Sequence, residues 1–391
     1  MKNRNNLKFI LVFVDVIVMS SGMSNSIKLS GGYFQQIYPV QISSMARILS
    51  NKLSEVDDCH NNVSYFDYGS VTNNLDDQQL QLREMVFLVK PELLSPEVDN
   101  QAIFTKALEV IAKNGYSIKA LKIVSGSYID KNDIVSRHFL VGNNAYRNGV
   151  LAISENALLQ IKNICEGHIY GGGQLIEKTG ISGEEMVGLW KEQYDLGNVK
   201  TIDHITNVAK ISYKDKVYCV LNASHYLNVA NYSSFSSKVV AIALISQNIS
   251  TPWMDMRKNV LGKTDPTKAL PGSLRNWVYS NMDELRVKVS SKIFNGFHLS
   301  DGPLSAMNEI NVWFPEVSLD ATFMGQLLIT KLGKDFNYDR CFDILYNICK
   351  NPYINYKIDD DVFNEQIFYF TRGMNPLEAV SFVVKVIDQL Q

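Results

Sequence analysis

The sequence predicts an α+β fold whose core begins with a strand, a helix, a second strand and a second helix. Residues 85–89 form an uninterrupted apolar run of strand length. Residues 102–112 repeat apolar side chains at the spacing of one helix face, whereas 116–124 alternate as a strand does. Residues 130–139 return to the helical pattern. These changes of period predict the first four elements of the core.

The rest of the chain continues this core and adds three further segments. Strand patterns return at 217–221 and 239–245, a helical pattern covers 252–261, and the alternation at 285–294 predicts another strand. Pro303 suits the first turn of a following helix. We expect a separate N-terminal extension at 1–82 with a helix near 43–53 and a loop at 56–80, a core at 83–150 and 216–320, an insertion at 151–215, and a C-terminal, mainly helical region at 321–391.

Composition excludes several classes of protein. A content of 46% hydrophobic and 20% charged residues is typical of soluble globular proteins. The formal net charge of −2 gives no basic surface for a nucleic acid, so phosphate binding would need a local group of cations. The five cysteines contain no C-x-x-C pair, which predicts neither a zinc site nor a disulfide framework and favours a cytoplasmic location.

The N-terminus allows two interpretations. Lys2 and Arg4 precede an apolar run at 9–19, as in a short secretory signal peptide. Asp15 interrupts this run, and the run is too short to span a bilayer. We therefore expect a buried strand, with a signal peptide as the alternative, and no membrane partner.

One segment around His298 carries the clearest chemical signal. A neutral imidazole accepts a phosphoryl group when a carboxylate orients it and cations hold the transferred phosphate. His298 lies between a predicted strand and a helix, and Glu309 lies on that helix, where it can return to the ring. Positive charge comes from three other segments, at Lys90, Arg257 and Arg275.

These residues resemble the motifs of the nucleoside diphosphate kinase family. The family pattern N-x-x-H-G-S-D, with a glutamate eleven residues after the histidine, appears as Asn295-Gly296-Phe297-His298-Leu299-Ser300-Asp301 followed by Glu309. The pattern L-G-x-T-x-P, followed by P-G-[ST]-[IL]-R, appears at 261–266 and 271–275. The pattern V-K-P-[DE] appears at 89–92.

The resemblance implies a role for each matching residue. His298 would be phosphorylated transiently, with Glu309 and Ser300 orienting it. Lys90 and Asn295 would contact the sugar hydroxyl and the phosphate in transit, and Arg275 and Thr264 would hold the diphosphate. Arg257 would be a further phosphate ligand, but it lies one residue further from Gly262 than in the family, so Lys258 is an alternative. Mg²⁺ would arrive on the nucleotide, without metal ligands from the protein.

Three departures from the family pattern affect the expected site. Leu299 replaces the family glycine and could narrow access to the imidazole. Arg137-His138-Phe139 matches the family motif E-H-Y without the tyrosine hydroxyl, and Ser224-His225-Tyr226 is a competing match. The insertion falls where a nucleotide-binding helical hairpin should close, and Tyr146 is the candidate for the surface that holds the base.

The resemblance also implies the architecture and the reaction. It predicts a ferredoxin-like β-α-β-β-α-β antiparallel sheet of four strands, with helices on one face and a helical insertion. The implied reaction is ping-pong transfer of the terminal phosphoryl group of a nucleoside triphosphate, through His298, to a nucleoside diphosphate. A homo-oligomer is the usual family assembly. The alternatives are a catalytically silent nucleotide-binding or scaffold module and a phosphotransferase that acts on another small-molecule acceptor.

Overall fold

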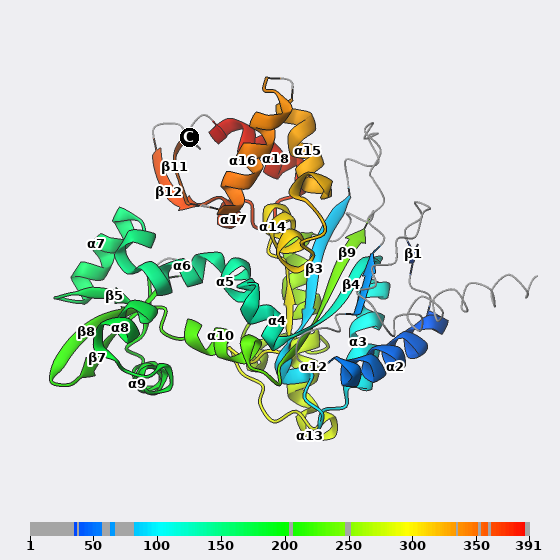
Figure 1. The fold of residues 1–391 in the computed structure, drawn as a ribbon, viewed down its shortest axis with the longest axis horizontal. Coiled ribbons are helices and arrows are strands. Elements are labelled where there is room, and N and C mark those ends of the chain that lie inside the picture. The colour runs from blue at the N-terminus through cyan, green and yellow to red at the C-terminus, as the bar shows by residue number, and fades with distance from the viewer. Residues whose placement is uncertain are drawn as a thin grey trace, which may run out of the picture.

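The computed structural model describes residues 35–36, 39–56, 63–66, 82–202, 206–246, 252–333, 335–350, 353–358 and 361–387. The predicted apolar strand at 9–19 lies outside these residues. A central sheet carries the core, the insertion extends to one side of it, and the C-terminal region packs at one end (Figure 1). Within the described ranges, every helix is too short or too polar to cross a membrane.

The central sheet has the strand order of a ferredoxin-like fold. Its core strands are β3 (Arg83–Val89), β4 (Ser117–Ser125), β9 (Lys238–Ser246) and β10 (Phe297–Leu299). They lie in the order β4, β9, β3, β10, and each strand is antiparallel to its neighbours. The first and third core strands of the chain therefore occupy the centre of the sheet. This arrangement confirms the predicted α+β architecture.

The N-terminal extension widens this sheet and does not stand apart from it. β1 (Gln35–Gln36) and β2 (Val63–Phe66) both pair antiparallel with β4, and β2 lies inside the segment that we expected to be a loop. Helix α2 (Pro39–Glu55) includes the predicted helix near 43–53. It packs against α3 (Asn100–Lys113), so the extension contributes to the main hydrophobic core.

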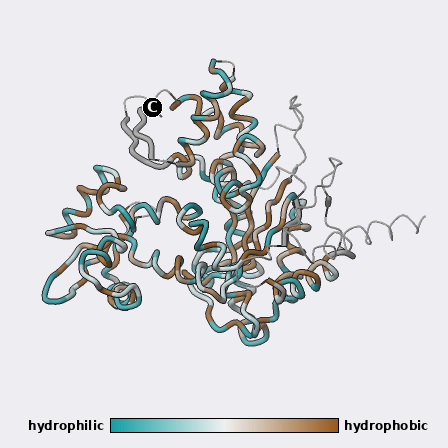
Figure 2. The backbone as a smooth tube through the Cα atoms, viewed as in Figure 1, coloured by the Kyte–Doolittle hydropathy of each residue, from teal (hydrophilic) through white to brown (hydrophobic). Residues whose placement is uncertain are grey.

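Helices cover both faces of the sheet, because successive strand residues point in opposite directions. Phe87 and Val89 of β3 pack with α2 and α3. Val86 and Leu88 face the opposite core, which includes residues of α5 (Ile134–His138), α10 (His225–Ser233) and α14 (Pro303–Trp313). The sheet is correspondingly the most apolar part of the chain path in Figure 2. The expectation of helices on one face is therefore wrong.

The predicted helix at 130–139 is divided by a turn. Helix α4 (Gly126–Lys131) ends before Asp133, whose φ of 48° is left-handed, and α5 begins directly after it. Helix α6 (Leu140–Asn148) follows α5. The turn brings His138 and Phe139 over the sheet next to α14. Short 3₁₀ helices elsewhere in the described chain span Pro91–Leu93, Gly149–Ala152, Pro266–Lys268 and Leu319–Ala321.

The insertion, which we call the insertion lobe (residues 149–222), contains its own mixed sheet as well as helices. Its strands lie in the order β5 (Ile169–Gly171), β8 (Lys216–Leu221), β7 (Asn207–Tyr213) and β6 (Lys200–Thr201). Its helices are α7 (Glu155–Ile164), α8 (Gly172–Thr179) and α9 (Gly183–Asp195). The expected boundary between 215 and 216 thus divides the hairpin of β7 and β8, and β8 pairs inside the lobe.

A disulfide between Cys165 and Cys219 joins the end of α7 to β8. Both residues are buried, and their positions are 54 residues apart in the chain. The expectation that the cysteines form no disulfide is therefore wrong for this pair. Local spacing gave no signal, because strand pairing in the lobe brings the two residues together. Because two cysteines form a disulfide, the cysteine content no longer supports a location in a reducing compartment.

The alternation at 285–294 does not form a strand. Helices α12 (Leu274–Ser280) and α13 (Met282–Leu285) precede an irregular segment that reaches β10. Arg286 has a left-handed φ of 58°, which no strand residue adopts. Val287 is buried but Val289 is 40% exposed, so the alternating side chains do not share one buried face.

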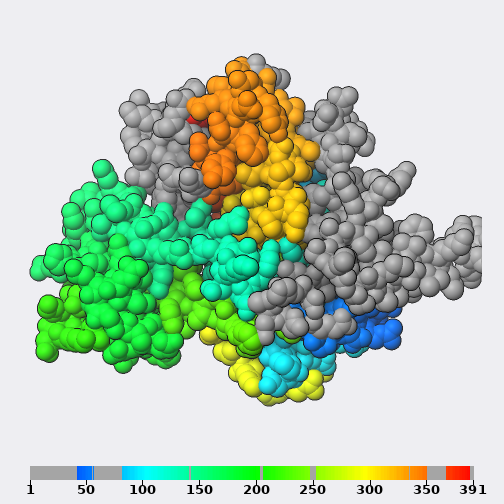
Figure 3. Space-filling model, in the orientation of Figure 1, coloured from blue at the N-terminus to red at the C-terminus, as the bar shows by residue number. Residues whose placement is uncertain are grey.

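The C-terminal region is mainly helical, as predicted, and has its own hydrophobic core. Helices α15 (Phe323–Leu332), α16 (Tyr338–Lys350), α17 (Ile367–Phe370) and α18 (Pro376–Val386) flank a hairpin of β11 (Tyr353–Ile358) and β12 (Asp361–Gln366). Leu304 and Met307 of α14 belong to this core. Helix α14 therefore joins the central sheet to the C-terminal region. Figure 3 shows the central core, the insertion lobe and the C-terminal region in contact on one face of the molecule.

The disulfide should stabilise the insertion lobe. Closing a loop between residues 54 apart lowers the entropy of the unfolded lobe by an amount worth about 4 kcal/mol. We expect dithiothreitol to increase hydrogen exchange of the β7 and β8 amides, which measures opening of the lobe. A Cys165→Ala/Cys219→Ala variant should exchange faster from the start and should not respond to the reductant. An equal response of this variant would contradict the pairing.

Candidate active site

His298 lies in the middle of β10, where strand pairing fixes the direction of its side chain. It is opposite Leu88 of β3 in the antiparallel register. Directly opposed residues share one face of a sheet, so the imidazole points toward α14, as Leu88 does. Phe297 and Leu299 point to the other face, into the core that contains α3. Leu299 is thus buried away from the ring, and the expectation that it narrows access to His298 is wrong.

A carboxylate and a hydroxyl orient the imidazole. The Nε2 atom of His298 lies 3.0 Å from Oε2 of Glu309. Ser300 donates to the same oxygen at 2.6 Å and accepts from the amide of Val86 at 2.8 Å. Because Oε2 of Glu309 accepts from Ser300, Nε2 of the neutral ring is the donor to this oxygen, and Nδ1 keeps its lone pair. The free nucleophilic atom is therefore Nδ1 of His298.

Three cations line the cavity around this ring, of which Lys90 and Arg275 are buried and Arg257 is partly buried. Lys90 follows β3 and donates to Oδ1 of Asn295 at 2.8 Å. Arg275, in the first turn of α12, donates to the carbonyls of Gly262 at 2.9 Å and Phe297 at 2.7 Å. Arg257 forms an ion pair with Asp301. These bonds hold the cations at fixed positions beside the strand that carries His298.

The electrostatics of the site favour a bound anion. Burial, followed by the charge of Arg257, holds the pKa of His298 well below its usual value, so the imidazole is neutral at pH 7. Burial is the main cause that lowers the pKa of Lys90 to about 8; Glu92 opposes this shift, and Arg275 adds to it. Burial lowers the pKa of Arg257 to about 9. Cations that are desolvated and repel one another bind an anion that relieves both penalties.

The extra residue before Gly262 is accommodated by a π-helical turn. A short helix, α11 (Trp253–Asp255), continues into the π-helix η4 (Met256–Leu261), as the helical pattern at 252–261 predicts. A π-helical turn contains one residue more than the α-helical path it replaces. Arg257 therefore still reaches the cavity despite its altered spacing, whereas Lys258 is exposed on the surface.

A cavity of about 450 Å³ opens at the imidazole. Of the sequence-predicted site residues, eight line it and Ser300 lies behind Glu309. The eight lining residues are Lys90, Phe139, Arg257, Thr264, Arg275, Asn295, His298 and Glu309. The structure thus brings together all nine residues, although they come from distant segments of the chain.

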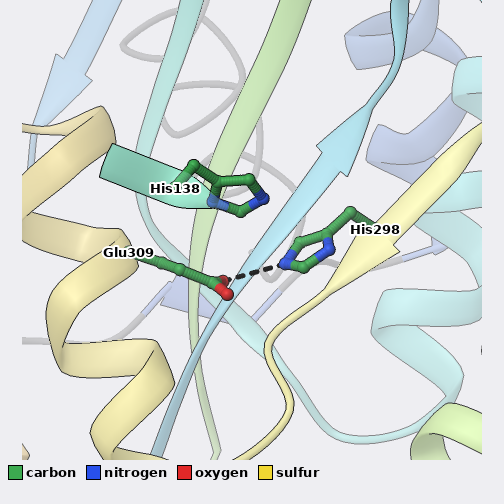
Figure 4. A group of neighbouring side chains, drawn as sticks. All are labelled: His138, His298 and Glu309. Atoms are coloured by element: carbon green, nitrogen blue, oxygen red, sulfur yellow. Dashed lines mark hydrogen bonds and ion pairs between the residues drawn. The ribbon is translucent and has the colours of Figure 1, made fainter. Parts of the chain in front are cut away.

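His138 lies next to the nucleophile but does not suit a metal ion. Figure 4 shows its ring beside His298 and Glu309, and a metal-ligating atom of each lies within 4.8 Å of the others. The indole nitrogen of Trp313 donates to Nδ1 of His138 at 3.2 Å. The neutral ring then carries its proton on Nε2, so neither nitrogen has a lone pair for a metal.

The carboxylates of the cavity also leave no dedicated magnesium site. Glu309 is occupied by His298 and Ser300, and Asp301 pairs with Arg257 and Arg372. Mg²⁺ prefers oxygen ligands and keeps several waters, so it is commonly held by nucleotide phosphates. Both carboxylates of the cavity are already paired with protein groups.

Comparison with known proteins relates this chain to nucleoside diphosphate kinases, although no family model matches it. The chain is 26% identical over 141 residues to nucleoside diphosphate kinase B of Flaveria bidentis and to a nucleoside diphosphate kinase of Helianthus annuus, which covers 36% of this chain and 81% of each relative. It is 35% identical over 68 residues to the nucleoside diphosphate kinase of Staphylococcus haemolyticus (strain JCSC1435). This match covers 17% of this chain and 39% of the relative.

The chain contains a divergent nucleoside-diphosphate-kinase-like domain. Among solved structures, the NDP kinase of Pyrobaculum aerophilum is 18% identical, with a TM-score of 0.31, covering 60% of this chain and 96% of that one. The Borrelia burgdorferi enzyme with vanadate and ADP is 15% identical, with a TM-score of 0.30, covering 60% and 88%. The match to S. haemolyticus spans well under half of that enzyme.

Two candidate residues around the kinase-like site have different surroundings from those expected. Tyr146 does not line the cavity, and packs against Gly172 and Gly173 inside the insertion lobe. It is therefore not a contact for the nucleotide base. The hydroxyl of Tyr226 donates to Glu184 of the lobe at 2.6 Å. Phe139, the other match to the family tyrosine, lines the cavity with its ring centroid 6.5 Å from that of His298.

Sequence reasoning missed several cavity residues. His225 lines the cavity, although we assigned it only to a competing motif. Asn207 and Asn222, from the insertion lobe, also line it. So does Arg372, from the C-terminal region, which has no motif around it. Asp301, another lining residue, belongs to the motif that contains His298, whereas Asn207, Asn222 and Arg372 carried no signal in the sequence.

Burial of His138 should make the stability of the kinase-like domain depend on pH. Burial lowers the pKa of His138 to about 3 in the folded protein, against about 6.5 in the unfolded chain. The unfolded state therefore binds a proton that the folded state does not, and stability is lost as pH falls from about 6.5 toward 3. Between pH 7 and pH 5 this one residue should remove about 2 kcal/mol.

A His138→Gln variant tests this, because its amide oxygen still accepts from Trp313. We expect the fall in unfolding free energy between pH 7 and pH 5, measured in urea, to be smaller in the variant by that amount. The same fall in both proteins would show that His138 is not neutral in the folded state.

Proposed function

We propose that the chain is a phosphotransferase that relays the terminal phosphoryl group of a nucleoside triphosphate, through His298, to a nucleoside diphosphate. The arrangement of a neutral imidazole, oriented by Glu309 and surrounded by desolvated cations, carries this proposal. The four motifs that resemble those of nucleoside diphosphate kinases are the reason for proposing a nucleotide as the substrate.

In the first half-reaction, Nδ1 of His298 attacks the terminal phosphorus. A nitrogen–phosphorus bond forms while the bond to the bridging oxygen breaks, and the nucleoside diphosphate leaves with that electron pair. The ring becomes cationic, and Glu309 stabilises it through the proton on Nε2. The second half-reaction reverses these steps, with the terminal oxygen of another diphosphate as the nucleophile. Both halves use one site.

The desolvated cations stabilise charge on the transferred group. Phosphoryl transfer depends mainly on positioning and on electrostatic stabilisation of the equatorial and leaving oxygens. Arg257, Lys90 and Arg275 are the cations that most affect the imidazole. Because they are already desolvated and held by hydrogen bonds, little reorganisation is required when the phosphate arrives. Magnesium, bound to the nucleotide, would add further charge neutralisation.

A second candidate function is transfer from His298 to an acceptor other than a nucleoside diphosphate. The observation that favours it is the wall of the cavity that the insertion lobe supplies, through Asn207 and Asn222. Ser224 and Asn228, next to the lobe on α10, extend this wall. These uncharged polar groups suit an acceptor with hydroxyl or amide groups. Incubation of the phosphorylated protein with different acceptors separates the two functions by the acceptor that removes the phosphate.

The proposal predicts a phosphohistidine at one position. Wild-type protein incubated with magnesium and terminally labelled ATP should acquire an acid-labile, alkali-stable label. His298→Ala should not acquire it, because the other histidine beside Glu309, His138, has its Nδ1 lone pair occupied by Trp313. His168→Ala, a change of an exposed histidine in the insertion lobe, is the matched control and should be labelled normally. Nucleotide binding by the wild type without any label would indicate a silent binding module.

Glu309→Gln should slow phosphorylation without preventing nucleotide binding. The neutral amide would no longer stabilise the cationic ring, which is expected to lower the rate about 100-fold or more. Rapid-quench measurement of label formation at saturating ATP gives this rate. Glu185→Gln, at an exposed position of α9, is the control for the same chemical change. A variant as fast as the wild type would exclude Glu309 from the reaction.

A further inference from the structure

A turn of the C-terminal region is fitted tightly against the turn that follows the nucleophile. The amide of Gly373 donates to the carbonyl of Asp301 at 3.1 Å. A Cβ at Gly302 would lie 2.6 Å from the carbonyl oxygen of Thr371, so only glycine allows this approach. Thr371 is fully buried, and its hydroxyl donates to the carbonyl of Ile367 at 2.9 Å. The turn is therefore held at a fixed distance from His298.

This turn places Arg372 in the wall of the catalytic cavity. Its Nε lies 3.6 Å from one oxygen of Asp301, while Arg257 pairs with the other oxygen. Phe368 and Tyr369, from α17, line the same part of the cavity. Arg372 is 35% exposed and Arg257 only 15%, so Arg372 lies nearer the mouth.

The charges of the cavity leave Arg372 available to a ligand. The lining side chains include four basic groups, Lys90, Arg257, Arg275 and Arg372, but only two carboxyl groups, Glu309 and Asp301. Asp301 pairs with both Arg257 and Arg372, and Glu309 is hydrogen-bonded to the imidazole. A guanidinium presents five N–H donors in a planar fork. A single ion pair uses few of these donors, so the others are available to a ligand. The surplus of cations requires an anion that extends from the imidazole toward the mouth.

The positions of Arg257 and Arg372 indicate how far that anion must extend from the imidazole. Arg257 and Arg372 pair with different oxygens of Asp301, and Arg372 is the more exposed of the two, so it lies nearer the mouth of the cavity than Arg257 does. A ligand whose terminal phosphoryl group is at Nδ1 would therefore reach Arg372 with a more distant phosphate. This step rests on the function proposed above.

We propose that Arg372 is a further phosphate-binding residue, which the C-terminal region contributes and which contacts the diphosphate part of the nucleotide. The C-terminal region is then part of the substrate site. A purely structural role is the weaker explanation, because a partly exposed ion pair contributes little to stability.

The test is calorimetric titration of the full chain with ADP and with AMP in the presence of magnesium. Arg372→Gln should weaken ADP binding about tenfold or more, because it removes a charge-assisted contact to phosphate. AMP binding should change much less. Arg372→Lys, which keeps the charge without the planar fork, should lie between the wild type and Arg372→Gln. Lys385→Gln, an exposed charge on α18 of the same region, is the matched control and should bind as the wild type does.

The outcomes separate this inference from the proposed function. Wild-type protein that binds no ADP would overturn both. Unchanged ADP binding by Arg372→Gln, in a wild type that binds ADP, would overturn the inference alone. Equal weakening of ADP and AMP, together with a lower melting temperature, would assign Arg372 a structural role and overturn it as well.

Discussion

The contact between His298 and Glu309 is the constraint on which the site depends. It joins an edge strand of the sheet to the helix that follows it, and Ser300 extends the link to the amide of Val86 in β3. The ring is therefore held by backbone pairing on one side and by a buried carboxylate on the other. Since α14 also contributes to the core of the C-terminal region, a change in that region would be transmitted to the imidazole.

Burial of like charges is the second constraint, and it acts against the folded protein. Lys90, Arg257 and Arg275 are each desolvated, and burial lowers the pKa of each. Their hydrogen bonds to Asn295 and to main-chain carbonyls offset part of this cost. The carboxylates of Asp301 and Glu92 offset a further part, and under the proposed function a bound phosphate would offset more of this cost. Such a site is stabilised by its ligand.

The sequence predicted the residues nearest His298 better than the other residues that line the cavity. The residues near His298 were found because they lie in short motifs. The strands β3 and β9 were found because each is a continuous apolar run. Arg372 could not be found, since its position depends on the packing of the C-terminal turn against Gly302. The disulfide depends in the same way on strand pairing inside the lobe. The strand expected at 285–294 failed because alternation alone does not show that one face is buried.

The insertion lobe leaves the nucleophile undisturbed because it enters and leaves the core at neighbouring points. Asn222, with a left-handed φ of 50°, ends the lobe after β8. Its side chain accepts from the amide of Asn207 at 2.8 Å and donates to the carbonyl of Gly142 in α6 at 3.2 Å. One amide thus ties the returning strand to the helix from which the lobe departs. The cavity wall that the lobe supplies at this junction, through Asn207 and Asn222, is therefore held to the kinase-like core by hydrogen bonds.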